Sequence, residues 1–210
     1  EVAILEVGLG GRLDAVNVFD AEAAIVTSVD LDHMEYLGDT REKIGFEKAG
    51  IFRAGRPAIC ADPAPPASLI QHARNIGADL RCVERDFSAQ REGNGWRFLG
   101  RAAIWSSLPL PAMVGAYQLR NAAAALAALE SVQIRLPVSE TALRQGLAAA
   151  QVPGRFQRLA GAPEVILDVA HNPEAARALA VTLREQPVPG RTLAVVGMLA
   201  DKDAAGVIDA

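Results

Sequence analysis

The sequence predicts an α/β protein with a parallel sheet and flanking helices, and three observations carry this prediction. Short apolar runs alternate with helical patterns over the first eighty residues, as they do in βαβ units. The chain has 210 residues and is 50% hydrophobic, which suits one large domain or parts of two. Aromatic residues make up only 5% of the chain, so helices are expected to pack on the sheet through small side chains.

The first part of the chain reads as strands and helices in alternation. Thr40 is expected to cap the first helix and Gly50 to end it. A Gly-Asn-Gly turn at 93–95 predicts a β-hairpin or a small antiparallel patch that runs through 96–110. The expected strands are 2–7, 24–29, 57–60 and 79–83, and the expected helices are 40–51 and 66–77.

A second unit is expected near the end of the chain. Helical patterns at 116–131 and 139–149 are followed by a break at Pro153-Gly154. A fresh βαβ pattern then covers a strand at 164–169, a helix at 173–186 and a strand at 192–198. We therefore expect a domain over 1–152, a linker over 153–161 and the beginning of a Rossmann-like α/β domain over 162–210. Both ends fall inside predicted elements, a strand at the start and a helix from Asp201 onward, so we expect a piece of a longer protein.

Composition excludes several classes of protein. The net charge of -4 and the absence of a basic stripe argue against a nucleic-acid partner. No apolar run approaches the roughly 18 residues of a membrane span, and no charged-then-apolar leader precedes the first strand. Cys60 and Cys82 belong to no motif, which fits a reducing cytosol, and they are expected to be small core residues.

Three residues in the first half could carry chemistry, because ligands of open α/β sheets bind beyond the carboxyl ends of strands. Glu6 enters the glycine loop 8–11, although a carboxylate there could merely cap the loop. His33 follows the second strand among carboxylates, where it could bind a metal or simply hydrogen-bond to a neighbouring acid. Lys48 has apolar neighbours that could lower its pKa or let it hold carbon dioxide as a carbamate. From the residues alone, a solvated lysine is the favoured interpretation.

Further candidates lie downstream. Gln118 and Asn121 share one face near the start of a helix, as base-reading amides or as ordinary exposed polar residues. Arg155 stands at the interdomain break, where a guanidinium could clamp phosphate or merely be solvated. Asp168 and His171 follow a predicted strand and are expected to face a crevice between domains.

The strand followed by Gly8-Leu9-Gly10 also resembles the start of a dinucleotide-binding fingerprint. The third glycine position is Leu13, however, and the next residues lack the apolar period of a helix that could hold a pyrophosphate. A fragment of a dinucleotide-binding oxidoreductase is thus a weaker alternative, as is a non-catalytic domain that retains the fold.

Six blocks in order resemble the folylpolyglutamate synthase/dihydrofolate synthase family of the Mur ligase superfamily. The first block, Leu5 to Asn17, points to the folate branch. Two departures are Val169, where the family usually has glycine, and Tyr117, where histidine commonly precedes Gln118. The blocks are 5–17, 31–33 with 37–38, 46–51, 118–121, 153–157 and 168–173.

The resemblance implies an ATP-dependent ligase that joins L-glutamate to a folate or dihydropteroate carboxylate through an acyl phosphate. It also implies that 1–152 is the C-terminal part of a central ATP-binding domain, that the phosphate loop lies upstream of Glu6, and that the 210 residues alone are inactive. The implied protein is a cytoplasmic monomer that acts on small molecules, with no membrane or nucleic-acid partner.

The resemblance also implies roles for individual residues. Its cofactors are ATP and Mg²⁺, with Glu6 and His33 as metal ligands. Lys48 would be a carbamylated catalytic lysine that supports a second metal ion. The implied nucleotide contacts are Asn121 to the base, Arg155 to the phosphates and Asp168 from the second domain, while His171 would act on nucleotide or glutamate.

Overall fold

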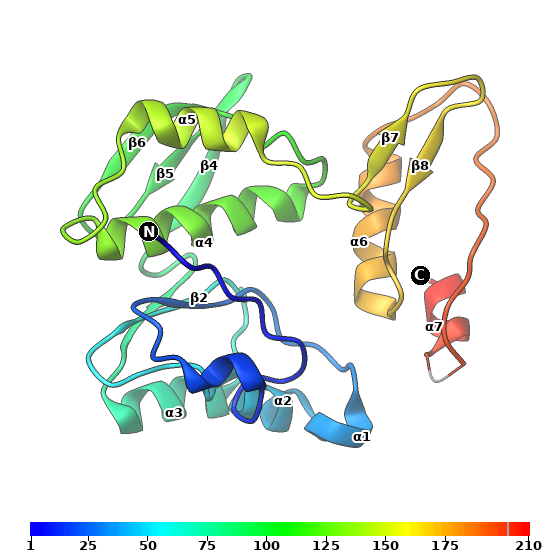
Figure 1. The fold of residues 1–210 in the computed structure, drawn as a ribbon. Coiled ribbons are helices and arrows are strands. Elements are labelled where there is room, and N and C mark those ends of the chain that lie inside the picture. The colour runs from blue at the N-terminus through cyan, green and yellow to red at the C-terminus, as the bar shows by residue number, and fades with distance from the viewer. Residues whose placement is uncertain (201) are drawn as a thin grey trace. The chain divides into compact units, whose positions relative to one another are not determined.

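The structure, a computed structural model, describes residues 1–200 and 202–210 (Figure 1). The chain divides into two compact units, residues 1–110 with 120–144, and residues 111–119 with 145–210. Helix α4 (Ala116–Val132) contributes to both units. The domain boundaries expected at 152/153 and 161/162 stay a prediction.

A three-stranded parallel sheet is the centre of the first unit. Its strands are β1 (Ala24–Val26), β2 (Pro57–Cys60) and β3 (Asp79–Cys82), in that spatial order. This sheet confirms three of the four strands expected here, and with the antiparallel patch described below it confirms the α/β fold class.

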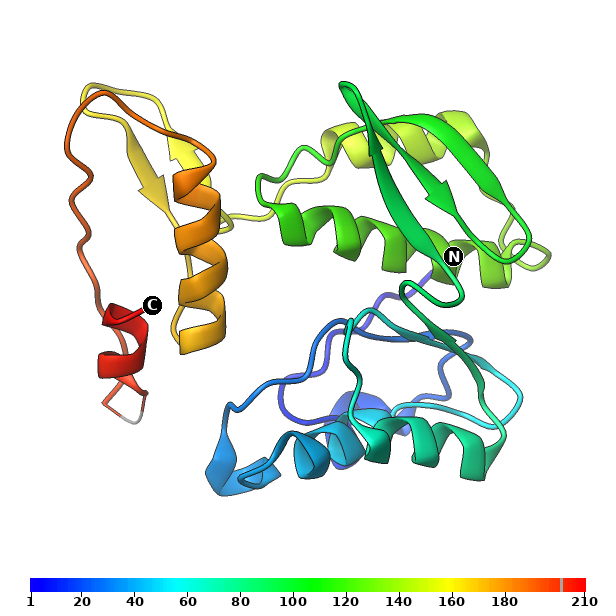
Figure 2. The same ribbon diagram turned by 180° about the vertical axis from the view of Figure 1, so that it is seen from behind.

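Two helices cover this sheet, α2 (Arg41–Ala49) and α3 (Ala67–Ile76), and they lie side by side in both views (Figures 1 and 2). The Thr40 side chain accepts a hydrogen bond from the Lys43 N–H at 3.3 Å, and Gly50 follows the last helical residue, as expected. Their small apolar side chains pack on the strands and exclude water from one core. That core includes Val26, Val29, Ile44, Ala49, Phe52, Ala58, Cys60, Leu69, Ala73 and Cys82.

The strand expected at 2–7 is wrong for this structure. The segment runs as an extended trace with no strand pairing, and its apolar side chains face solvent, with Ile4 93% exposed. A strand forms when a neighbour satisfies its backbone N–H and C=O groups, and no described segment pairs with this one.

The first unit also contains an antiparallel sheet, as the Gly-Asn-Gly turn predicted. It consists of β4 (Ser88–Glu92), β5 (Gly95–Leu99) and β6 (Ile104–Pro109), and it is seen clearly in Figure 2. Trp96 and Phe98 of β5 are fully buried. Glu130 of α4 accepts hydrogen bonds from the N–H groups of Ala102 and Ala103, which fixes the turn before β6.

Among its described residues, the second unit holds a β-hairpin and the helices α6 (Pro173–Arg184) and α7 (Ala204–Ile208), besides the start of α4. Strands β7 (Gln157–Leu159) and β8 (Val165–Leu167) pair antiparallel, and α6 and α7 follow. The parallel βαβ expected here is therefore wrong for the described residues. Residues 192–198 form no strand, since no described segment pairs with their backbone, and Leu193 is 81% exposed. The predicted helical start is α7, and Asp201 lies outside the described residues.

Three short features complete the description. The 3₁₀ turn η1 (Ala15–Val18) follows the glycine loop, α1 (Met34–Leu37) follows His33, and α5 (Glu140–Ala149) begins after Ser139. The Ser139 hydroxyl accepts a hydrogen bond from the Ala142 N–H at 3.2 Å and so caps the helix expected at 139–149. Within the described residues, the longest apolar helices are too short or too polar to cross a bilayer.

Candidate functional site

The glycine loop packs on the C-terminal end of α2, next to the backbone of Lys48. The Arg12 N–H donates to the Glu47 carbonyl at 2.8 Å, and the Arg12 guanidinium pairs with the Glu47 carboxylate at 2.9 Å. Gly11 has φ +154°, and a Cβ at this position would lie 2.9 Å from the Glu47 carbonyl oxygen and 3.1 Å from that of Lys48. Only glycine allows so close an approach. The first and third sequence blocks therefore form one structural element.

Asp14 and Asn17 shape this loop. The Asp14 carboxylate accepts hydrogen bonds from the N–H groups of Leu9 (2.9 Å), Val16 (3.0 Å) and Gly8 (3.0 Å). These bonds, that from Leu9 most strongly, hold the pKa of Asp14 below its ordinary value. The Asn17 side-chain amide donates to the Gly50 carbonyl at 3.1 Å, which ties the loop to the end of α2.

The loop does not lead into a helix that could bind a pyrophosphate. It runs into η1, which has four residues and is a 3₁₀ turn. A dinucleotide fingerprint needs a helix N-terminus at this point. The structure thus confirms the interpretation of Gly8-Leu9-Gly10 as a different kind of loop.

A buried carboxylate holds together the carboxyl ends of β1 and β2. Asp62, 4% exposed, accepts hydrogen bonds from the Val29 N–H at 2.8 Å and from the Arg41 guanidinium at 2.9 Å. Arg41 also donates to the Val29 carbonyl at 2.8 Å. These bonds fix the point from which the chain leaves β1, directly before the acidic loop 30–33.

His33 sits at the end of that loop in an uncommon backbone conformation. Its φ of 49° is left-handed, which histidine adopts more readily than most residues. Its side chain is 38% exposed, and its Nε2 lies 3.8 Å from an Asp32 carboxylate oxygen. At 3.8 Å this approach is longer than a hydrogen bond, so both interpretations of His33 stay predictions.

The predicted metal ligands fit a magnesium ion by chemistry. Glu6 is exposed and offers the carboxylate oxygens that Mg²⁺ prefers, while Lys48 is half-buried and would offer oxygens only as a carbamate. Across the residues that the structure describes, no group of three or more His, Cys, Asp or Glu side chains is arranged to hold a metal. The convergence of Glu6, His33 and Lys48 therefore stays a prediction.

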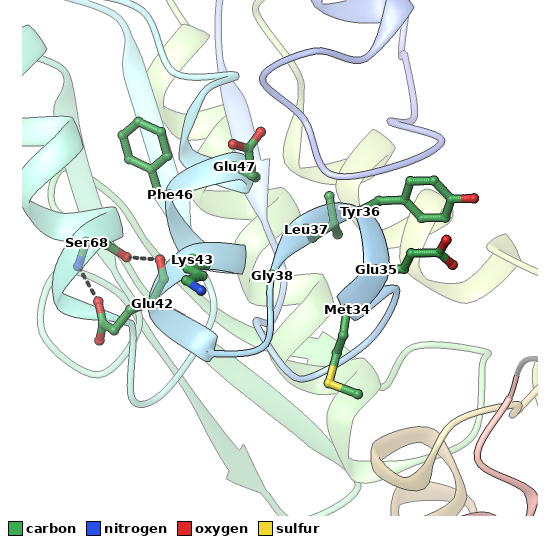
Figure 3. A pocket seen from close by; sticks show the side chains of 10 residues that line it. All are labelled: Met34, Glu35, Tyr36, Leu37, Gly38, Glu42, Lys43, Phe46, Glu47 and Ser68. Carbon is green, nitrogen blue, oxygen red and sulfur yellow. Dashed lines mark hydrogen bonds between the residues drawn. The ribbon is translucent and has the colours of Figure 1, made fainter.

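A shallow pocket of about 600 Å³ lies along α1 and α2 and reaches the start of α3 (Figure 3). Glu42 forms one wall, where its carboxylate accepts hydrogen bonds from the N–H groups of Ala67 (3.1 Å) and Ser68 (2.7 Å) and so caps α3. None of the seven predicted site residues lines the pocket. Its lining is Met34, Glu35, Tyr36, Leu37, Gly38, Glu42, Lys43, Phe46, Glu47 and Ser68.

In the second unit, Asp168 fastens the segment that follows Gly154. Its carboxylate accepts hydrogen bonds from the Phe156 N–H at 2.8 Å and the Ala170 N–H at 2.9 Å. The Val169 N–H donates to the Gly154 carbonyl at 2.9 Å. The structure thus brings exposed Arg155 into the neighbourhood of Asp168.

His171 and Tyr117 belong to the same unit. His171 is exposed, and its Nδ1 lies 2.9 Å from the Val169 carbonyl oxygen. Burial raises the pKa of Tyr117 and the nearby Asp168 charge adds to this effect, while a hydrogen bond with Gln118 and the charge of Arg155 oppose it. Tyr117 is thus a neighbour of two predicted site residues.

Asn121 lies half-buried in α4, one turn after Gln118. Gln118 is only 5% exposed, so the alternative of two ordinary exposed amides is wrong for this residue.

Asp62, Arg41 and Tyr117 were missed as members of the site. Asp62 follows an apolar strand, as Glu6 does, and the same strand-end argument could have found it. Tyr117 was noted only as a departure from the family pattern. No signal in the sequence joins it to Asp168, because the two lie far apart along the chain.

Comparisons with known proteins agree with the sequence blocks. Residues 154–210 match the family model "Mur ligase, glutamate ligase domain". The dihydrofolate synthase/folylpolyglutamate synthase of Escherichia coli (strain K12) is 49% identical over 210 residues, covering 99% of this chain and 48% of that protein.

Two solved structures are similar to nearly the whole chain. Escherichia coli FolC in complex with DHPP and ADP has a TM-score of 0.90 at 47% identity, over 97% of this chain and 48% of that one. A bifunctional folylpolyglutamate synthase/dihydrofolate synthase with Mn, AMPPNP and L-glutamate bound has a TM-score of 0.87 at 47% identity, with the same coverage. The chain spans about half the length of the curated relatives it matches. The chain is therefore similar along nearly its full length to folylpolyglutamate synthase/dihydrofolate synthase enzymes, and its last part matches the Mur ligase glutamate ligase domain.

Proposed function

We propose that the chain is part of an ATP-dependent ligase that adds L-glutamate to a folate or dihydropteroate carboxylate. The observation that carries this proposal is the 49% identity to an Escherichia coli dihydrofolate synthase/folylpolyglutamate synthase over 99% of the chain. Neighbouring structures hold ADP, or AMPPNP with Mn and L-glutamate, which supports ATP and Mg²⁺ as cofactors here. The oxidoreductase alternative is not favoured, because the loop after Gly8 leads into a 3₁₀ turn.

The proposed reaction has two steps. The folate or pteroate carboxylate attacks the γ-phosphorus of ATP and forms an acyl phosphate with release of ADP. The amino group of glutamate then attacks the acyl carbon, an amide forms, phosphate leaves and the amine loses its proton. Bound Mg²⁺ supplies positive charge that offsets the charge on the transferring phosphoryl group.

In this proposal the first unit holds the metal ions and the acyl phosphate. Glu6 and His33 bind magnesium, and the carbamate on Lys48 supports the second ion. The docking of the glycine loop on the carbonyls of Glu47 and Lys48 supports this assignment, because it fixes the backbone that carries Lys48. Asp62 and Arg41 play the same positioning role for the loop that ends at His33.

Nucleotide contacts are proposed for both units. Asn121 would face the base, Arg155 would neutralise phosphate charge, and Asp168 would orient the nucleotide, with His171 near the nucleotide or the incoming glutamate. The hydrogen bonds from Phe156 and Ala170 to Asp168 support this part of the proposal, because they give the segment around Arg155 a defined backbone. We further propose a cytoplasmic monomer whose partners are small molecules, in line with its net charge of -4.

The test is replacement of Lys48 in the intact protein. We expect Lys48→Ala to lower folate- and glutamate-dependent ADP release by at least about a hundredfold, since it removes a group proposed to support the transferring phosphoryl charge. Lys43→Ala is the matched control, because Lys43 lies on the same helix and its exposed ammonium pairs with Asp39 at 2.9 Å. Full activity of Lys48→Ala with both folate and glutamate would contradict the proposed role.

A direct product assay separates the ligase from the non-catalytic alternative. Mass spectrometry of the folate product should reveal addition of one glutamate that requires ATP and a divalent ion. An intact, folded protein that yields no such product under any of these conditions would favour the alternative of a non-catalytic domain that retains the fold.

A further inference from the structure

The two cysteines of the chain are direct neighbours across the parallel sheet. Cys60 ends β2 and Cys82 ends β3, and the two residues are register partners. Their side chains therefore point to the same face of the sheet. Neighbouring strands lie about 4.8 Å apart, which falls within the Cα separations that a disulfide can bridge.

The two thiols also interact. Each thiol shifts the pKa of the other, and no disulfide joins them. Both residues are buried, at 0% and 4% exposure, which confirms their expected place in the core. A buried S–H that donates to a neighbouring sulfur stabilises the thiolate on that neighbour.

Charges around the pair favour ionisation of Cys82. The Cys60 thiol lowers the pKa of Cys82 to about 7, and the guanidinium groups of Arg85 and Arg101 act in the same direction, while burial and Asp86 oppose them. The neighbouring Cys82 thiol and burial raise the pKa of Cys60. This division gives the pair one thiolate nucleophile and one thiol in contact with it.

The backbone at both cysteines is fixed. The Val83 N–H donates to the Cys60 carbonyl at 2.9 Å, and the Cys82 N–H donates to the Asp86 carboxylate at 2.8 Å. Asp86 is held in turn by Arg85 at 2.7 Å and Arg101 at 2.8 Å. The backbone that carries the two cysteines is therefore held in place on both strands.

We propose that Cys60 and Cys82 form a peroxide-reactive dithiol site that closes to an intramolecular disulfide. The Cys82 thiolate attacks one oxygen of hydrogen peroxide, an S–O bond forms, the O–O bond breaks, and the departing hydroxide takes up a proton to become water. The sulfur of Cys60 then attacks the sulfenic sulfur of Cys82, an S–S bond forms, and the S–O bond breaks. The leaving hydroxide takes the Cys60 proton, so two thiols and one peroxide give a disulfide and two waters.

The burial of the two cysteines favours a small oxidant such as hydrogen peroxide. With Cys82 only 4% exposed, a molecule of about the size of two waters can approach its sulfur more easily than a bulky disulfide can. The site does not depend on the proposed ligase reaction. It does lie close to the Asp62 anchor, which follows Cys60 by two residues.

The experiment treats the intact, folded protein with hydrogen peroxide, blocks free thiols and maps peptides by mass spectrometry without reductant. We expect a peptide that links Cys60 to Cys82, formed while the circular dichroism spectrum stays native and lost on reduction with dithiothreitol. Recovery of both cysteines as blocked thiols, or a cross-link that appears only once the protein has unfolded, would overturn the proposal.

Two single variants test the order of events. Cys60→Ser leaves Cys82 without its thiol partner, so we expect a sulfenic acid at Cys82, trapped by dimedone that is added with denaturant after the peroxide is removed. Cys82→Ser should leave Cys60 unmodified at the same peroxide dose. Trapping at Cys60 instead of Cys82 would reject the assigned order. Should either variant fail to fold, the peptide map of the unsubstituted protein decides the proposal by itself.

Discussion

Replacement of Gly11 by alanine tests whether the glycine loop is docked on the end of α2. The loop reaches Lys48 only because Gly11 lacks a side chain. A Cβ there would lie 2.9 Å from the Glu47 carbonyl oxygen, 3.0 Å from an Ile51 methyl group and 3.1 Å from the Lys48 carbonyl oxygen. Two of these three atoms belong to the backbone of the helix end, which cannot rotate away.

The structure gives the size of the effect. A φ of +154° is a region almost restricted to glycine and costs other residues about 1–3 kcal/mol. Overpacking against fixed atoms adds about 1–3 kcal/mol. Gly11→Ala should thus lower the free energy of unfolding by about 2–6 kcal/mol, and release of the loop from α2 would limit the loss to the lower part of that range. Gly55→Ala is the control, because φ is +65° and nothing lies within 4 Å of the added Cβ, so about 1–2 kcal/mol of strain remains.

Urea unfolding of both variants measures the difference, and hydrogen exchange at residues 8–12 reports whether the loop has left the helix. We expect Gly11→Ala to lose at least about 1 kcal/mol more than Gly55→Ala, or to lose about as much as Gly55→Ala while the loop amides exchange freely. Equal losses in the two variants, with loop amides still protected, would refute the reasoning.

Two further predictions concern carboxylates of the first unit. Asp62→Ala leaves the buried N–H of Val29 without its acceptor and should cost about 2–4 kcal/mol in urea unfolding, whereas Asp39→Ala, at a 73% exposed side chain, should change stability by less than about 0.5 kcal/mol. A loss at Asp62 no larger than that at Asp39 would contradict its anchoring role. Asp14 should titrate by NMR below 3.8, so its loop bonds are complete above the unfolded pKa and are lost as pH falls through the lower folded value. An Asp14 pKa at or above 3.8 would mean that Gly8, Leu9 and Val16 do not donate to it.

Local signals predicted the elements whose ends are set by neighbouring residues. Thr40 and Gly50 delimit α2 through a side-chain cap and a glycine, both of which can be read from sequence. β2 coincides with the predicted run 57–60, since its apolar residues fit a strand enclosed by two others. These elements depend little on distant parts of the chain.

The errors occur where pairing decides the outcome. The apolar runs 2–7 and 192–198 have strand-like composition, but a strand also needs a neighbour, and composition does not reveal whether one is present. β8 was expected beside a following parallel strand and pairs instead with β7 in an antiparallel hairpin. The short connection between β7 and β8 gives an antiparallel pair, in place of the longer crossover that a parallel pair requires.

The candidate site was predictable where it follows strand ends and not where it depends on packing. The strand-end argument led to Glu6 and His33, but the contact of Arg12 with Glu47 joins residues far apart in sequence. Tyr117 and Asp168 likewise approach each other only through the fold of the second unit. The family pattern named the blocks, and the structure adds which of them touch.

The first block separates into residues that build the loop and one whose side chain is exposed. Arg12 and Asn17 bind the loop to the end of α2, while Asp14 accepts hydrogen bonds from backbone N–H groups within the loop. Glu6 is exposed and precedes the docked loop. The docked loop holds Gly11 and Arg12 against the backbone of Glu47 and Lys48. For the proposed metal site, such preorganisation would lower the entropy lost when an ion binds.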